Sequence, residues 1–174
     1  MPVFVLNKYE MLALIFILCP VIQVSASLLC QKADDRHFVR DSFLYKIRRW
    51  EKNGEFYDTV FKVRRWKGLL PDGGALLKGG YSKKHVDASS PESLEEFILE
   101  SRRGELAHWL AIPPFLVFVL FTPPLVFVLL LVYAIAVNLP CVIAQRYNRP
   151  RAAKTLDGLK RREAAKSKKQ GETK

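Results

Sequence analysis

The chain has 174 residues, the length of a single domain, and 49% of them are hydrophobic. Residues 11–29 and 109–144 contain no charged side chain. Uncharged apolar stretches of about 18 residues or more are typical of membrane-embedded segments, which excludes a wholly soluble protein. The segment between them is too short for the core of a large enzyme but long enough for a compact membrane-associated unit.

The net charge of +11 is unevenly distributed along the chain. Residues 30–108 hold 16 basic and 13 acidic side chains, whereas residues 145–174 hold 11 basic and 3 acidic ones. A basic segment directly after an apolar run is expected on the cytoplasmic side of a membrane, where it can also contact anionic lipid. Tyr147 is the only aromatic residue of this tail, and the lack of aromatic interleaving argues against nucleic acid as a partner.

The three cysteines, Cys19, Cys30 and Cys141, show neither the spacing of metal ligands nor a disulfide framework. Two of them lie in apolar runs, so all three are expected to be small apolar packing residues. No metal site is expected from this pattern.

Residues 1–29 predict an N-terminal hydrophobic helix that is either a retained membrane anchor or a cleaved signal peptide. Residues 24–26 (VSA) would be a small-residue cleavage site. The flank after the apolar run is basic, whereas Glu10 cancels the charge of Lys8 before it. This asymmetry favours a retained anchor whose C-terminal side faces the cytoplasm.

Residues 30–108 are predicted to form a basic, aromatic region with amphipathic helices at the membrane interface. KIRRW at 46–50 is echoed by KVRRW at 62–66. Two sets of apolar residues are spaced for one helix face each: Phe43, Ile47 and Trp50, and Phe56, Val60 and Val63. Lys52-Asn53-Gly54 predicts a turn between them. Arginine beside tryptophan suits a membrane interface, and an ordinary solvated helix pair is the alternative.

Residues 71–74 (PDGG) predict a loop, residues 78–90 an irregular segment, and a helix begins at Pro91. Ser90 can cap this helix, and proline suits its first position. One stripe of the helix holds these residues: Leu94, Phe97, Ile98, Ser101, Glu105, His108 and Trp109. Glu105 and His108 are therefore expected on the buried face, where the apolar run begins.

A broken hydrophobic hairpin is predicted over residues 109–145. As one helix this run would be about 55 Å long, too long for a single crossing of about 30 Å. Proline pairs at 113–114 and 123–124 interrupt it, because an internal proline removes a backbone hydrogen bond. We expect a short or re-entrant arm to Phe121 and a full second arm from Leu125 onward. One tilted span is the alternative.

The second arm is expected to end near Ala144, after a polar break at Asn138 and Pro140. A basic cytoplasmic tail, residues 146–174, follows. It opens with a polar cluster at the interface: Arg146, Tyr147, Asn148 and Arg149. If the hairpin is present, this cluster returns to the membrane level of Glu105 and His108.

The ionisable residues beside the apolar run suit acyl transfer to a hydroxyl. His108 can act as a base near neutral pH, with Glu105 one turn away to orient its ring. Arginines at a lipid surface can bind a phosphate, a carboxylate or a developing oxyanion. The alternative for the Glu–His pair is a structural hydrogen bond, although ionisable groups within a membrane are costly and therefore point to function.

Other catalytic motifs are absent from the sequence. His37 and Asp41 in HFVRD are one residue too close for an HxxxxD acyltransferase box. There is no GxSxG nucleophile elbow, no HExxH and no glycine loop for phosphate.

Three blocks, FYDTVFKVRRWKGLLPDGG, ESRRGELAHW and PCVIAQRYNRPR, occur in this order around the apolar segments. In these blocks the chain resembles the glycosyl-4,4′-diaponeurosporenoate acyltransferase family, over about residues 36–152. The resemblance implies a bacterial cell-membrane enzyme at the end of staphyloxanthin-type carotenoid synthesis. It would move a fatty acyl group to the sugar primary hydroxyl of a glycosylated C30 carotenoid acid.

This reading assigns His108 as the base and Glu105 as the residue that orients it. Arg146 and Arg149 would bind the donor's phosphate or the oxyanion, and Tyr147 and Asn148 the sugar or the donor. The remaining assignments comprise a group for docking to the interface or the donor (Arg64, Arg65, Trp66 and Lys67) and three further candidates (His85, Arg103 and Asn138). No cofactor or metal is expected, and acyl-CoA is favoured as the donor, with a carrier protein left open.

The rival hypothesis is a non-enzymatic membrane adaptor whose basic tail binds anionic lipid or a partner. An adaptor should lose function when the tail after Lys154 is deleted, whereas an enzyme with its chemistry in residues 105–149 should largely keep it. A membrane-anchored nucleic-acid binder would instead show strongly salt-dependent binding by the tail.

Overall fold

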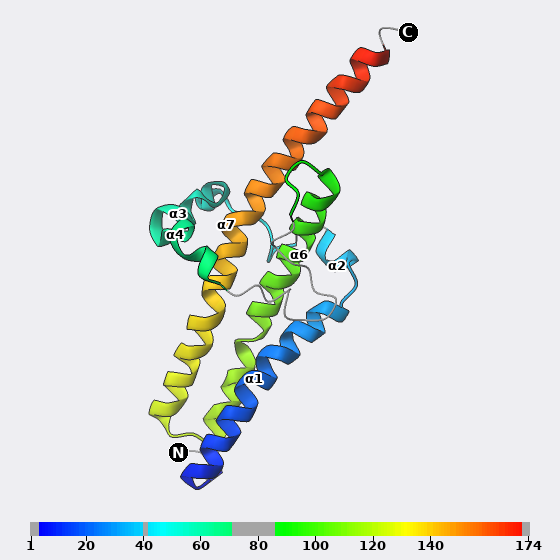
Figure 1. Ribbon diagram of the computed structural model, residues 1–174. Helices are drawn as coiled ribbons and strands as arrows, with labels where there is room; N and C mark the ends of the chain where they lie inside the picture. The colour runs from blue at the N-terminus through cyan, green and yellow to red at the C-terminus, as the bar shows by residue number, and fades with distance from the viewer. Residues whose placement is uncertain (1–3, 40–41, 71–85, 172–174) are drawn as a thin grey trace. The chain divides into compact units, whose positions relative to one another are not determined.

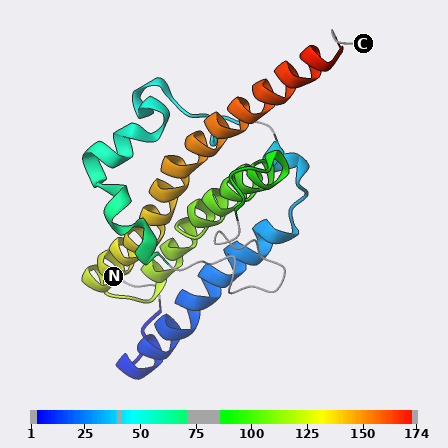
Figure 2. The same cartoon turned by 45° about the horizontal axis from the view of Figure 1, so that its top comes forward.

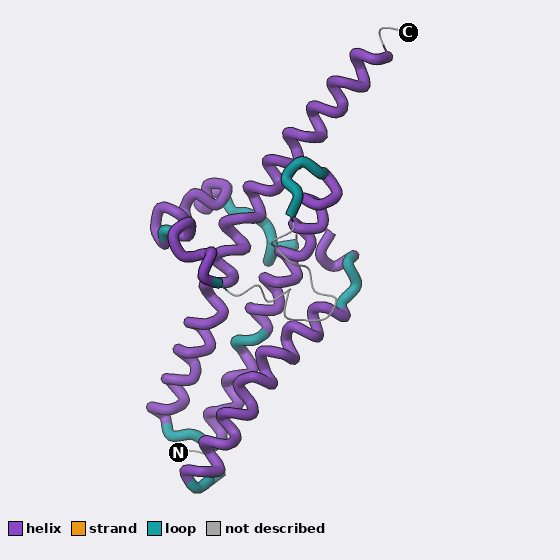
Figure 3. Tube along the Cα trace, in the orientation of Figure 1, coloured by secondary structure: helices purple, strands orange, loops and turns teal. Residues whose placement is uncertain are grey.

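The computed structural model describes residues 4–39, 42–70 and 86–171. The predicted loop at residues 71–74, most of the segment 78–90 and His85 lie outside the described residues. The described part is mostly helical and contains no strand (Figures 1 and 3). Its elements, in chain order, are α1 (Lys8–Lys32), α2 (Arg36–Val39), η1 (Arg49–Gly54), α3 (Glu55–Phe61), α4 (Val63–Trp66), η2 (Lys67–Leu69), α6 (Pro91–Leu110), η4 (Pro113–Leu120) and α7 (Pro124–Gly171).

Three helical segments of the described chain are long and apolar enough to cross a membrane: Lys8–Lys32, Pro91–Leu120 and Pro124–Lys168. They correspond to the predicted N-terminal helix and to the two arms of the predicted hairpin. The fold class expected from the sequence, a mostly α protein with apolar membrane helices, is confirmed.

The chain divides into two compact units, and each long helix of the hairpin contributes to both. Unit 1 comprises residues 1–34 and 103–142, and unit 2 comprises residues 35–102 and 143–174. Unit 1 is therefore the apolar part, and unit 2 holds the basic interfacial region together with the tail.

In unit 1, helix α1 begins with a capping box at Asn7. The Asn7 side chain accepts a hydrogen bond from the backbone N–H of Glu10 at 3.0 Å. In return, the Glu10 carboxylate accepts one from the backbone N–H of Asn7 at 2.9 Å. This reciprocal arrangement satisfies N–H groups that have no partner inside the helix.

The core of unit 1 is an aromatic cluster on η4 and the first half of α7. Phe115, Phe118, Phe121 and Ala134 are buried and packed together. One apolar side of helix α1 packs against this cluster through Met11, Leu14, Ile15, Leu18, Cys19 and Ile22, and Leu6, just before the helix, joins them. The small side chain of Ala134 leaves room for the phenylalanine rings, and the N-terminal helix thus completes the core of this unit.

The predicted hairpin is present, and its prolines mark the breaks (Figure 1). Helix α6 ends at Leu110, three residues before Pro113, and η4 continues the arm as a 3₁₀-helix. A short turn follows, in which the Thr122 hydroxyl donates to the carbonyl oxygen of Phe118 at 2.7 Å. Helix α7 starts at Pro124, a first helical position where the missing N–H costs no hydrogen bond.

The expected break at Asn138 and Pro140 does not interrupt the helix, and the expected end of the membrane arm near Ala144 stays a prediction. Helix α7 runs without interruption from Pro124 to Gly171, through Pro140 and Pro150 (Figures 1 and 2). Pro140 lies in the apolar run, and membrane helices tolerate an internal proline where neighbouring groups or local adjustments satisfy the freed backbone group.

In unit 2, the predicted turn is confirmed, but the first predicted amphipathic helix is not. Lys52, Asn53 and Gly54 all have positive φ angles, of 46°, 54° and 87°. Phe43 lies in a turn rather than a helix, and the first helical residue of this segment is Arg49. Residues 46–48 of the KIRRW block have no regular secondary structure, and Arg48 is extended directly before the short 3₁₀-helix η1 begins.

The second predicted helix is split into two short pieces, α3 and α4, at Lys62. Lys62 has a φ of 53°, so it closes α3 and starts α4 in a left-handed conformation. Because of this split, α3 and α4 bury different faces: Tyr57 on α3 and Val63 on α4 are buried, whereas Val60 on α3 is 53% exposed. The expected face of Phe56, Val60 and Val63 is therefore not a single face.

Helix α6 begins as predicted. The Ser90 hydroxyl accepts a hydrogen bond from the backbone N–H of Ser93 at 3.2 Å, which is the expected cap. The predicted stripe is buried at Leu94, Phe97, Ser101 and Glu105, but Trp109 at its end is 36% exposed.

Gly54 is the point where the loop of unit 2 touches the backbone of α7. A Cβ atom at this position would lie 2.9 Å from the carbonyl oxygen of Tyr147 and 3.2 Å from that of Arg146. Together with its φ of 87°, this close approach requires glycine.

We expect Gly54→Ala to lower the free energy of unfolding by about 1 to 3 kcal/mol, because it adds both backbone strain and a clash with rigid helix backbone. Thermal unfolding of the full chain in detergent micelles measures the effect. Gly68→Ala is the matched control, since nothing lies within 4 Å of a Cβ built there. Equal stability of the two variants would contradict the close approach of the loop.

Candidate functional site

The first polar cluster lies inside unit 1 and joins the two arms of the hairpin. His108 Nδ1, on α6, lies 2.9 Å from Asn138 Oδ1, on α7. Asn138 is 1% exposed, and its amide nitrogen donates to the carbonyl oxygen of Ala134 at 2.9 Å. A histidine is thus held by a buried amide within the apolar unit, in surroundings where polar groups are costly unless they are paired.

Glu105 lies one turn before His108 on the same helix and is fully buried. His108 is half-buried, so the sequence-based expectation that the two residues face inward holds in full for the glutamate and in part for the histidine. The role of Glu105 in orienting the ring stays a prediction. Arg103, a further candidate, is half-buried in the same unit.

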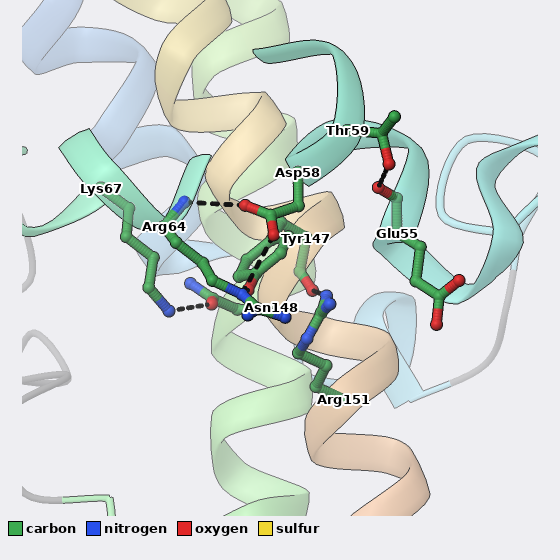
Figure 4. Close-up of polar contacts among 8 residues, drawn as sticks. All are labelled: Glu55, Asp58, Thr59, Arg64, Lys67, Tyr147, Asn148 and Arg151. Atoms are coloured by element: carbon green, nitrogen blue, oxygen red, sulfur yellow. Dashed lines mark hydrogen bonds and ion pairs between the residues drawn. The ribbon is translucent and has the colours of Figure 1, made fainter. Parts of the chain in front are cut away.

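The second polar cluster lies in unit 2 and brings the RRWK block together with the RYNRPR block (Figure 4). Arg64 Nε donates to the hydroxyl of Tyr147 at 2.9 Å. Lys67 Nζ donates to Asn148 Oδ1 at 2.8 Å. We call Arg64, Lys67, Tyr147, Asn148 and Arg151 the Tyr147 cluster.

Cations surround the buried ring of Tyr147. Lys67 Nζ lies 4.9 Å from the ring centroid, and the guanidinium carbon of Arg151 lies 3.8 Å from it. Both distances are within the range of cation–π attraction. The Arg151 guanidinium also donates to the carbonyl oxygen of Tyr147 at 2.9 Å, so this arginine is held along the helix it belongs to.

Asp58 is the carboxylate beside this cluster, 3.0 Å from Arg64 Nε. Three cations against one carboxylate leave a net charge of two positive units at neutral pH, counted over Arg64, Lys67, Arg151 and Asp58. The hydrogen bond to Tyr147, followed by the attraction of Asp58, raises the pKa of Arg64. The Arg64 side chain is 69% exposed, so it stays charged and can reach an anion.

Arg146 and Arg149 hold the segment 44–51 against helix α7. Arg146 forms an ion pair with the fully buried Glu51 at 2.6 Å and donates to the carbonyl oxygen of Leu44. Arg149 is 3% exposed and donates to the carbonyl oxygen of Tyr45 at 2.9 Å. These described bonds give both arginines a structural role, and their proposed contact with substrate stays a prediction.

Arg65 and Trp66, the other two residues of the RRWK block, lie outside the Tyr147 cluster. Arg65 is exposed on α4. The indole Nε1 of Trp66 donates to the carbonyl oxygen of Phe61 at 2.7 Å, which fixes the ring against the end of α3.

Sequence reasoning missed Glu51, Asp58 and Arg151 as members of these clusters. The signal for Arg151 was present, because it follows Tyr147 by four residues, which is one helical turn. Glu51 is the one acidic residue in the basic stretch 46–52, and it could have been recognised as a partner for an arginine. Among the described residues, no group of three side chains could hold a metal ion.

The fold and the two clusters define a small helical protein with three segments able to cross a membrane, a polar pair formed by His108 and Asn138, and a basic site. The family model of glycosyl-4,4'-diaponeurosporenoate acyltransferase matches residues 41–158, a range that contains both clusters. The chain belongs to this family.

Curated relatives agree with the family match over most of the chain. Glycosyl-4,4'-diaponeurosporenoate acyltransferases of Staphylococcus aureus strains RF122 and USA300 are each 35% identical over 142 residues. The corresponding protein of strain Newman is 34% identical over the same length. In each case the alignment covers 82% of this chain and 86% of the relative. No solved structure matches the chain.

We expect Glu51→Ala to lower the free energy of unfolding by about 3 to 5 kcal/mol, because it leaves the Arg146 guanidinium without its buried carboxylate. Glu95→Ala is the control, since its ion pair with Lys160, at 2.6 Å, lies between side chains that are more than half exposed. That exposed pair should contribute less than about 1 kcal/mol. Thermal unfolding of both variants in micelles measures the difference, and equal losses would argue against the structural role of the Arg146 pair.

Proposed function

We propose that this chain transfers a fatty acyl group from acyl-CoA to the sugar primary hydroxyl of a glycosylated C30 carotenoid acid. The observation that carries the proposal is the family match over residues 41–158, with the His108–Asn138 pair and the Tyr147 cluster inside it. The three apolar helices support a location in the bacterial cell membrane, where both the carotenoid and the product would reside.

In the proposed reaction, His108 takes the proton of the acceptor hydroxyl. The hydroxyl oxygen attacks the carbonyl carbon of the thioester, the carbon–sulfur bond breaks, and the leaving thiolate receives the proton from the imidazolium. Glu105 would stabilise the imidazolium while it is charged. The buried position of Glu105 and the fixed ring of His108 support these roles, since a base must be held in reach of one hydroxyl.

The Tyr147 cluster would bind the phosphates of the donor. Its net positive charge and the exposure of Arg64 support this role, because guanidinium and ammonium groups bind phosphate through charge-assisted hydrogen bonds. Tyr147 and Asn148 place those cations. Arg146 and Arg149 would act mainly by holding the segment 44–51 in place, and Arg65 and Trp66 would contact the membrane interface.

Pigment mass spectrometry tests the proposal. A host that makes the glycosylated C30 carotenoid acid should gain a species heavier by one fatty acyl group when it expresses this chain. The mass of that species would give the acyl chain length. An unacylated glycoside, with the protein present in the membrane, would overturn the proposed acceptor.

The same assay separates the enzyme from a membrane adaptor. His108→Ala should lower turnover by about 100-fold or more, because the general base is lost, while membrane insertion is retained. Deletion of the tail after Lys154 should leave most of the activity in place. Full activity of the His108 variant would remove the base from the mechanism, and inactivity of the tail deletion would favour the adaptor.

We expect Lys67→Met to raise the KM for acyl-CoA about 10-fold and to leave kcat within a factor of about two, because one charge-assisted hydrogen bond to phosphate is lost. Lys154→Met, on an exposed part of α7, is the control and should leave both constants unchanged. Steady-state kinetics in proteoliposomes measure both. A fall in kcat without a rise in KM would argue against phosphate binding at the Tyr147 cluster.

A further inference from the structure

The surroundings of Asn138 determine which way its amide points. Its Nδ2 atom lies 2.9 Å from the carbonyl oxygen of Ala134, and a carbonyl oxygen can only accept a hydrogen bond. Turning the amide over would bring two oxygens together at that distance. Both Asn138 and Ala134 are almost fully buried, so no bulk water competes for these positions. The amide oxygen Oδ1 is therefore the atom that faces His108.

This orientation defines the protonation of the His108 ring. The distance from Asn138 Oδ1 to His108 Nδ1 is 2.9 Å, and an amide oxygen accepts but cannot donate. Nδ1 must then carry a hydrogen. A neutral imidazole carries only one such hydrogen, so its other nitrogen, Nε2, holds the lone pair.

We propose that Asn138 is a positioning residue that fixes neutral His108 as the Nδ1–H tautomer and makes Nε2 the nitrogen that takes the hydroxyl proton. This inference rests on the proposed function, in which His108 is the base. It adds to the expectation drawn from the sequence, in which Glu105 orients the ring and Asn138 is a further candidate without an assigned role.

The chemistry of the two arms explains why an asparagine suits this position. Asn138 lies inside an apolar stretch of α7, where a charged carboxylate would be costly to bury. An amide accepts the same hydrogen bond without a charge, and its second group is satisfied by the helix backbone. The contact also crosses from α7 to α6, 30 residues away in sequence, so it fixes the rotation of the ring as well as its tautomer.

Nitrogen NMR of the full chain in micelles, labelled with ¹⁵N-histidine, tests the tautomer directly. The chain has three histidines, so the His108 signals are assigned by their loss in His108→Gln. We expect a protonated, pyrrole-type Nδ1 and an unprotonated, pyridine-type Nε2. A proton on Nε2 of the neutral wild-type ring would overturn the inference without any change at Asn138.

Variants at Asn138 test whether the tautomer matters for turnover. Asn138→Leu should move the proton towards Nε2 and lower kcat at least about 10-fold, with the KM for acyl-CoA unchanged. Asn138→Asp retains an acceptor oxygen, so it should keep the Nδ1–H tautomer and more activity than the leucine variant. Thr122→Val removes a different buried polar group of unit 1, a hydroxyl bonded within its own arm, and should change neither the spectrum nor kcat.

The outcomes separate this inference from the proposed function. Loss of activity in His108→Ala with full activity in Asn138→Leu would overturn the positioning role and leave the base in place. Full activity in His108→Ala would remove the base and the positioning role together. If the wild-type chain acylates no glycoside, the proposed function fails, and the wild-type NMR spectrum still decides whether Asn138 sets the tautomer.

Discussion

Polar groups in the apolar unit of this protein have to find their partners within the chain itself, because hydrocarbon offers none. The described structure of unit 1 follows this constraint. Thr122 and Asn138 each bond to the carbonyl oxygen four residues earlier, and the free side of the Asn138 amide meets His108. Helix α7 also continues unbroken through Pro140, the internal proline of its unit 1 part. The Thr122 hydroxyl is therefore satisfied on its own arm, whereas the Asn138 amide also joins His108 on the other arm.

The basic residues of unit 2 fall into two groups, one bonded to buried parts of the chain and one at the Tyr147 cluster. The described bonds of Arg146 and Arg149 go to a buried carboxylate and to backbone carbonyls of the segment 44–51. Arg64 and Lys67 instead extend from short helices and bond to the side chains of Tyr147 and Asn148. The Arg64 side chain is largely exposed there. An arginine adjacent to a motif tyrosine thus need not act on a ligand. Burial and the nature of the bonded partner distinguish the two groups, and neither property is visible in the spacing of the residues.

The elements that could be predicted from sequence are those with strong local signals. Ser90 and Pro91 indicate the start of a helix, and the proline pairs indicate the breaks of the hairpin. Lys52-Asn53-Gly54 indicates a turn. The prediction of the first interfacial helix was wrong because apolar spacing alone does not show that the chain forms a turn at residues 43–45 and becomes helical only at Arg49. Pro140 did not break its helix, since the cost of a proline depends on the surroundings. The contact of His108 with Asn138 joins residues on different arms, so local patterns pointed only to each residue separately.

The 3₁₀ form of η4 changes the reach of the first arm. A 3₁₀-helix rises about 2.0 Å per residue, against about 1.5 Å in an α-helix, so its eight residues extend about 16 Å instead of about 12 Å. It also repeats every three residues, which places Phe115, Phe118 and Phe121 in one column, with ring centroids 5.4 and 5.5 Å apart. The 3₁₀ form therefore both lengthens the first arm of the hairpin and aligns its three phenylalanine rings. Relaxation to an α-helix would shorten the arm and turn successive rings of this column away from α1.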